Sequence, residues 1–156
     1  MTGEITPTLN DWAGGLAVFE RLMTLFYQRV AQDPLLAPLF AHMDPSHPQI
    51  VAKFMVEVFG GPALYSQERG GHHSMIRKHL GKHLTEAHRS RWMGLLLECA
   101  DTAGLPTDPE FRSAFVAYLE WGTRLAVNNS QTNEVPDVSS AMPRWGWGET
   151  GGPYKG

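Results

Sequence analysis

Apolar residues recur along the chain at the spacing of an amphipathic helix. The first such stretch begins at Leu16 and follows the i, i+3, i+4, i+7 rule, with apolar residues at Phe19, Leu22, Met23, Phe26 and Val30. A second begins near residues 46–48 and places on one face Val51, Phe54, Met55 and Val58. We expect an α-helix over each stretch, because the apolar stripe can then face a common core.

Two further helices are predicted in the second half of the chain. One begins near Thr85 and ends at Gly104, and its inward positions are Trp92, Leu95, Leu96 and Cys99. The other begins at Asp108-Pro109, an N-cap followed by proline at the first helical position, and its pattern ends at Asn128.

Turn-forming residues separate these helices. Asp33-Pro34 predicts a short turn through Phe40, and glycine pairs at 14–15 and 60–61 end the segments before them. Residues 62–84 are polar and rich in histidine, and we expect a loop there with a short helix near its end. Because no alternating run is bounded by hairpin turns, the sequence predicts an all-α domain.

The helical pattern also suggests how the chain is divided. We assign residues 13–129 to one helical domain, residues 1–12 to an N-terminal extension and residues 130–156 to a C-terminal extension that is extended or partly disordered. The C-terminal extension contains few apolar residues, and we expect Trp145 and Trp147 to pin part of it to the surface.

Composition narrows the class of protein. The 156 residues are 42% hydrophobic and 19% charged, which excludes a wholly disordered chain. A net charge of −3 and a pI near 6.1 argue against a nucleic-acid partner. No run approaches the roughly 18 apolar residues of a membrane span, and no secretory signal is visible. With Cys99 as the single cysteine, we expect a cytoplasmic protein without a membrane partner.

Seven histidines are the side chains most suited to bind a ligand. His79 and His83 are four residues apart, as in a zinc pair on one helix face, but Gly81 weakens the helix and no nearby cysteine or carboxylate completes the set. Hydrolase motifs such as G-x-S-x-G and H-E-x-x-H are absent, and Cys99 lies on an apolar helix face. A helical chain of this kind points to a cofactor bound between helices.

The order of the remaining features resembles the truncated haemoglobins, which are small globins with a 2-over-2 helical sandwich. The resemblance covers about residues 10–130 and rests on the anchors Trp12-Ala13-Gly14-Gly15, Phe26-Tyr27, Phe40 and Phe59-Gly60-Gly61-Pro62. The stretch Tyr65–Gly70, Arg77-Lys78-His79 and then Trp92 is similar to group II of that family, in which a tryptophan follows the proximal histidine by thirteen residues, as Trp92 follows His79.

This resemblance implies a haem protein and assigns the residues that would hold the cofactor. His79 would be the proximal iron ligand of one haem b, with His83 as the fallback. The absence of a C-x-x-C-H motif excludes covalent c-type attachment. Arg77 and Lys78 could pair with the haem propionates. The apolar walls would be Phe40, Val51, Phe54 and Leu96. The C-terminal extension after about Ser130 should be dispensable for haem binding.

The opposite side of the haem would carry hydrogen-bond donors to the ligand. Tyr27 offers a phenol O–H and Trp92 an indole N–H, and a ligand with partial negative charge, such as dioxygen, is stabilised by both. At the start of the next helix, counting back from Gly60-Gly61 indicates His47, whereas counting forward from Phe40 indicates Pro48. A histidine there would add a donor, a gate or a second axial ligand.

The resemblance implies reversible binding of dioxygen, carbon monoxide, nitric oxide or similar small ligands. The alternative is a haem redox enzyme, such as a nitric oxide dioxygenase or a peroxidase, that works with a reductase. One pocket can serve either role, so the family does not separate them. A third interpretation is a helical domain that binds no cofactor. For the oligomeric state, we consider a homodimer.

Overall fold

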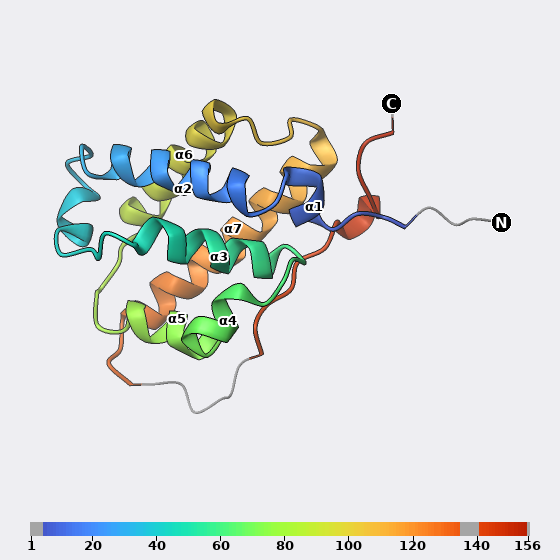
Figure 1. Ribbon diagram of the computed structural model, residues 1–156. Helices are drawn as coiled ribbons and strands as arrows, with labels where there is room; N and C mark the ends of the chain where they lie inside the picture. The colour runs from blue at the N-terminus through green and yellow to red at the C-terminus, as the bar shows by residue number, and fades with distance from the viewer. Residues whose placement is uncertain (1–4, 135–140, 156) are drawn as a thin grey trace.

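A computed structural model describes residues 5–134 and 141–155, and the regular structure of these residues is helical (Figure 1). The α-helices are α1 (Leu9–Ala13), α2 (Leu16–Val30), α3 (His47–Val58), α4 (Leu64–Arg69), α5 (His72–His79), α6 (Glu86–Ala103) and α7 (Pro109–Ser130). Two 3-10 turns complete the set, at Ala37–Phe40 and Gly148–Thr150. The prediction of an all-α fold is therefore confirmed.

The helix ends follow the capping signals in the sequence. The Thr85 side chain accepts from the His88 amide while His88 Nδ1 accepts from the Thr85 amide, which forms a capping box at the start of α6. The Asp108 carboxylate accepts from the Phe111 amide and caps α7. Gly104 ends α6 with φ near 81°, a left-handed conformation that glycine adopts without strain.

Residues 62–84 form two short helices, so the prediction of a loop with one short helix was wrong. The reason is a buried carboxylate on α3. Both oxygens of Glu57 accept hydrogen bonds from Ser66, one from the amide at 2.8 Å and one from the hydroxyl at 2.5 Å. This contact stabilises the first turns of α4, and no local pattern around Ser66 signals it.

The core lies where two helix pairs meet. Helix α2 packs on α3 and on α6, α6 packs on α7, and α7 also contacts α5 (Figure 1). The fully buried aromatic residues of the core include Phe19, Phe26, Phe59, Tyr65, Phe111 and Phe115. Each such side chain contributes about 1.5–3 kcal/mol of stability by burial. This arrangement is the globin-like sandwich that the resemblance implied, and it leaves α5 at one side of the molecule.

Described segments near both ends of the chain, at residues 7–13 and 142–147, lie against this core. Leu9 on α1 is 1% exposed and belongs to the core. The stretch after residue 140 returns along the end of α3, where the Trp145 amide donates to the Val58 carbonyl at 2.7 Å. The Trp147 indole N–H donates to the Pro7 carbonyl at 2.8 Å, and its ring packs edge-on against Trp12. The division at residues 12 and 129 stays a prediction. No helix within the described ranges is long and apolar enough to cross a membrane.

Candidate functional site

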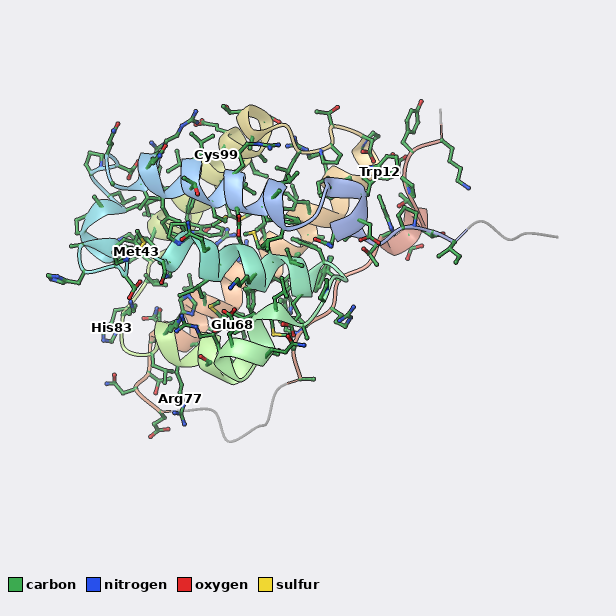
Figure 2. All side chains as sticks on the ribbon, in the orientation of Figure 1. Trp12, Met43, Glu68, Arg77, His83 and Cys99 are labelled. Atoms are coloured by element: carbon green, nitrogen blue, oxygen red, sulfur yellow. The ribbon has the colours of Figure 1, made fainter. Side chains whose placement is uncertain are left out.

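One cavity brings together most of the candidate site residues. It lies among α2, the turn at Ala37–Phe40, α3, α5, α6 and α7, and the candidates that line it are Tyr27, Phe40, His47, Val51, Phe54, Lys78, His79 and Trp92. Two candidates lie elsewhere. Leu96 is fully buried in the core behind the cavity wall, and Arg77 lies on the outer side of α5 (Figure 2), where it lines a surface cleft with Arg69 and Ser74.

His79 lies at the end of α5 with one ring nitrogen already occupied. Its Nδ1 is 2.9 Å from the Met75 carbonyl oxygen, one turn earlier in the helix. A carbonyl only accepts, so Nδ1 carries the proton and donates it, and Nε2 of the neutral ring keeps a free lone pair. Burial lowers the pKa of His79, which favours this neutral form. His79 therefore offers the cavity one nitrogen ligand in a fixed tautomer.

His83 is placed differently. It follows α5 in an exposed loop with φ near 51°, outside the cavity (Figure 2). Its backbone amide donates to the Ser130 carbonyl at 2.9 Å, which fixes the backbone there. No group of three or more histidine, cysteine, aspartate or glutamate residues within the described ranges could hold a metal ion. The structure thus gives no support to a zinc site built on His79 and His83.

A hydrogen-bonded pair occupies another part of the cavity. The Tyr27 hydroxyl on α2 lies 3.0 Å from His47 Nε2, and the two rings meet edge-on at 4.9 Å between centroids. His47 is the first residue of α3 and its ring lines the cavity, whereas Pro48 is not among the lining residues. Of the two candidates from the sequence, His47, obtained by counting back from Gly60-Gly61, is therefore the one that lines the cavity.

Both members of this pair are uncharged at neutral pH. Burial raises the pKa of the Tyr27 phenol well above its usual value. Burial, together with the positive charges of Lys78 and Lys82, lowers the pKa of His47 to about 4. The pair can therefore present hydrogen-bond donors without carrying a net charge.

Trp92 completes this side of the cavity. Its ring lies edge-on to Phe26, with 5.1 Å between centroids, and is held on the inward face of α6. Within the described parts of the chain, its indole N–H donates to no acceptor. Because an indole N–H can only donate, Trp92 is free to bond a ligand that enters the cavity.

The remaining walls include residues that the sequence did not single out. Helix α7 supplies a long face, including Tyr118, Leu119, Trp121, Gly122 and Leu125. Helix α5 adds His72, seven residues before His79 and therefore on the same helix face. That spacing was the signal that could have identified His72. The sequence also shows the apolar pattern of α7, but this pattern does not tell whether an apolar residue lines the cavity or packs in the core.

These features together test whether the cavity suits the predicted cofactor. The walls are mainly apolar, His79 presents a free nitrogen in a fixed tautomer, and Lys78 and Lys82 supply positive charge beside it. A lone imidazole is too few ligands for a free metal ion, yet it is enough for iron that a macrocycle already holds. The cations suit the carboxylates of such a macrocycle. The residues present therefore fit haem.

Comparisons with known proteins agree with this arrangement. Residues 8–121 match the family model of the bacterial-like globins. The chain is 31% identical to the group 2 truncated haemoglobin YjbI of Bacillus subtilis over 121 residues, which span 77% of this chain and 89% of that protein. A solved haemoglobin from Chloroflexus aurantiacus is 31% identical, with a TM-score of 0.69 over 78% of this chain and 98% of its own.

A solved truncated oxygen-avid haemoglobin from Bacillus subtilis is 28% identical, with a TM-score of 0.69 over 78% of this chain and all of its own (100%). The family match extends from α1 into α7 and includes the helices that line the cavity. The chain therefore belongs to the bacterial-like globin family, and within it to the group II truncated haemoglobins, which makes it a haem globin that binds small ligands.

Proposed function

We propose that the cavity holds one haem b without a covalent bond and that the protein reversibly binds dioxygen and other small diatomic ligands there. The observation that carries this proposal is the hydrogen bond from His79 Nδ1 to the Met75 carbonyl, which leaves Nε2 free as an axial ligand. His79 would hold the haem, and the haem would supply an iron atom able to bind a diatomic ligand.

The other walls of the cavity orient the cofactor and exclude water. Phe40, Val51 and Phe54 present apolar surface to the macrocycle, whereas Leu96 is buried in the core and does not line the cavity. Lys78, which lines the cavity beside His79, pairs with a propionate. Arg77 is exposed on the outer side of α5, so its part in propionate binding is secondary to that of Lys78.

Three side chains then select ligands that take on negative charge. Trp92 donates its free indole N–H, and the Tyr27–His47 pair donates one of its protons. A buried donor of this kind stabilises bound dioxygen far more than bound carbon monoxide, because dioxygen takes on more negative charge. The haemoglobin described as oxygen-avid among the similar structures supports dioxygen as the ligand.

The distal side of the pocket is uncharged near pH 7. The pKa of Tyr27 is raised and that of His47 is lowered to about 4, so both side chains are neutral there. A neutral phenol and a neutral imidazole can each present a hydrogen-bond donor to a bound ligand. This supports the ligand-binding role that we propose for the cavity.

Two measurements on the purified protein test this proposal. Absorption spectra in the ferric state, in the ferrous state and with carbon monoxide should show a histidine-ligated haem. A protein that purifies without a Soret band and takes up no added haem would contradict the cofactor assignment. The ferrous protein should then bind and release dioxygen over repeated cycles. Rapid catalytic consumption of nitric oxide or peroxide with a reductase, together with rapid autoxidation, would instead support the enzyme.

A further inference from the structure

Helix α5 carries His79 but has little packing of its own. It is eight residues long, which is too short to be stable alone in water. Among its residues whose side chains the structure describes, His72 and Ile76 are buried. One side-chain contact ties its middle to α4, where the Tyr65 hydroxyl donates to Ser74 Oγ at 3.3 Å. An axial ligand needs a defined orientation, so other parts of the chain must fix the two ends of α5.

The end of α5 is joined to the residues that close α7. Just after His79, the Gly81 amide donates to the Thr132 carbonyl at 2.8 Å. The His83 amide donates to the Ser130 carbonyl at 2.9 Å, and the Leu84 amide donates to Ser130 Oγ at 2.9 Å. These bonds connect positions 46 to 51 residues apart, and they fix the loop into which α5 runs.

Ser130 is at the centre of this connection. It is completely buried, and its hydroxyl donates to the Val127 carbonyl at 2.7 Å while it accepts from the Leu84 amide and from Gln131 Nε2. A hydroxyl has one proton and two lone pairs, so its full capacity is used. Gln131 Nε2 also donates to the Leu84 carbonyl at 2.8 Å. Because water does not reach this position, removal of the hydroxyl leaves the Leu84 amide without a partner.

The start of α5 is held by stacked rings. The His72 imidazole lies against Trp121 of α7, with 6.3 Å between centroids and 25° between planes. Trp121 in turn packs against Trp145 at 5.7 Å, and Trp145 also meets Tyr118 at 5.5 Å. The Trp145 amide is fixed by its 2.7 Å bond to the Val58 carbonyl. Because His72 Nδ1 has no hydrogen-bond partner within the described structure, the stack is its main support.

We propose that Ser130 and Trp145 are positioning residues that hold the two ends of α5 and so set the orientation of His79 in the cavity. The effect on His79 as an axial ligand rests on the proposed function, whereas the hold on α5 does not. This inference reverses one expectation from the sequence. Truncation after about Ser130 removes Thr132 and Trp145, and so it should weaken haem retention rather than leave it unchanged.

Hydrogen exchange measured by mass spectrometry tests the hold on α5 directly and does not depend on haem. In Ser130→Ala, amides of residues 72–82 should exchange about 5- to 160-fold faster, the range expected when a buried amide is left without its acceptor, while those of α2 and α3 stay unchanged. Ser113→Ala is the matched control, because Ser113 is on the same helix and bonds the Glu110 carbonyl without contacting α5. Ser130→Thr, which keeps the hydroxyl, should restore slow exchange.

Trp145 is tested in the same way. Trp145→Ala should accelerate exchange in residues 72–82, and Trp145→Phe, which keeps a ring against Trp121, should largely restore it. Trp147→Phe is the control for loss of an indole elsewhere in the same stretch. If Trp145→Ala does not fold, Trp145→Leu replaces the ring with an aliphatic side chain and takes its place. Exchange in residues 72–82 that equals the controls for both Ser130→Ala and Trp145→Ala would overturn the proposal.

The haem-loaded protein gives a second and separate readout. In Ser130→Ala and Trp145→Ala, the ferrous iron–histidine stretching band in the resonance Raman spectrum should shift or broaden, and haem should transfer to apomyoglobin severalfold faster. Both quantities should return toward wild type in Ser130→Thr and Trp145→Phe. Unchanged Raman bands with faster exchange would overturn the orientation of His79 by these residues. A protein that never binds haem would contradict the proposed function instead. The hydrogen-exchange data would then still test whether Ser130 and Trp145 fix α5.

Discussion

Replacement of Trp92 by phenylalanine isolates one hydrogen-bond donor of the cavity. The change removes the indole N–H and keeps an aromatic ring on the inward face of α6, next to Phe26. This N–H has no acceptor within the described residues, so its full capacity is available to a ligand. We expect Trp92→Phe to release dioxygen faster than wild type.

The size of the effect follows from the charge on the ligand and from the partners already present. A hydrogen bond to a charged group contributes about 1.5–3 kcal/mol, which corresponds to about 10- to 150-fold in the rate of dioxygen release. Tyr27 differs, because its hydroxyl already bonds His47 Nε2 at 3.0 Å. It exchanges one partner for another, so Tyr27→Phe should cost about 0.5–1.5 kcal/mol, or about 2- to 13-fold.

Stopped-flow displacement of dioxygen and of carbon monoxide measures both release rates. Trp12→Phe is the matched control, because Trp12 also loses an indole N–H but bonds Asp108 far from the cavity. Carbon monoxide release should change little in every variant, since that ligand carries little charge when bound. The double variant of Trp92 and Tyr27 should be non-additive if the two donors share one network. Equal acceleration of both gases in Trp92→Phe would show that the ring acts by its bulk, and the hydrogen-bonding role would be refuted.

Three further predictions concern α3. His47→Ala should change ligand association rates in flash photolysis while haem stays bound, and unchanged rates and ferric spin state would place His47 outside the ligand path. The pKa of His47 is about 4 in the folded protein against a usual value near 6.5, so the unfolded chain binds a proton on this imidazole first and stability falls as pH drops from 6.5 to 4. The urea midpoints at pH 7 and pH 4.5 should therefore differ less in His47→Phe than in wild type. An equal loss of stability in both proteins would contradict the assignment. Glu57→Ala should destabilise the fold by about 1–3 kcal/mol, because the Ser66 amide and hydroxyl lose their acceptor. Glu68→Ala is the exposed control, and an equal urea midpoint in the two variants would contradict the role of Glu57 in capping α4.

The sequence predicted the elements whose signals are local. Thr85 and Asp108 cap the helices that they were expected to start, and Gly104 ends α6 as predicted. The apolar spacing also identified the stripes of α2 and α3 that face the core. These features depend on residues three or four positions apart, so they can be found without knowledge of the fold.

What the sequence did not show depends on tertiary contacts between distant positions. The bond from the Leu84 amide to Ser130 Oγ joins residues 46 positions apart, and no composition or periodicity in either segment indicates it. The stack of Trp121 on Trp145 likewise requires the chain to return along α3. Leu96 lies one turn after Trp92 on the same face of α6, yet it is fully buried and does not line the cavity. The helical pattern identifies that face but does not show where along α6 the cavity ends.

The most direct test of the haem site compares ferrous absorption spectra of His79→Ala and His83→Ala. His79 lines the cavity with its Nε2 free, whereas His83 is exposed in the loop beyond α5. His83→Ala should keep the five-coordinate, histidine-ligated spectrum of the wild type. His79→Ala should lose it or purify mostly without haem, and added imidazole should restore a nitrogen-ligated spectrum. A normal spectrum in His79→Ala together with its loss in His83→Ala would contradict the account.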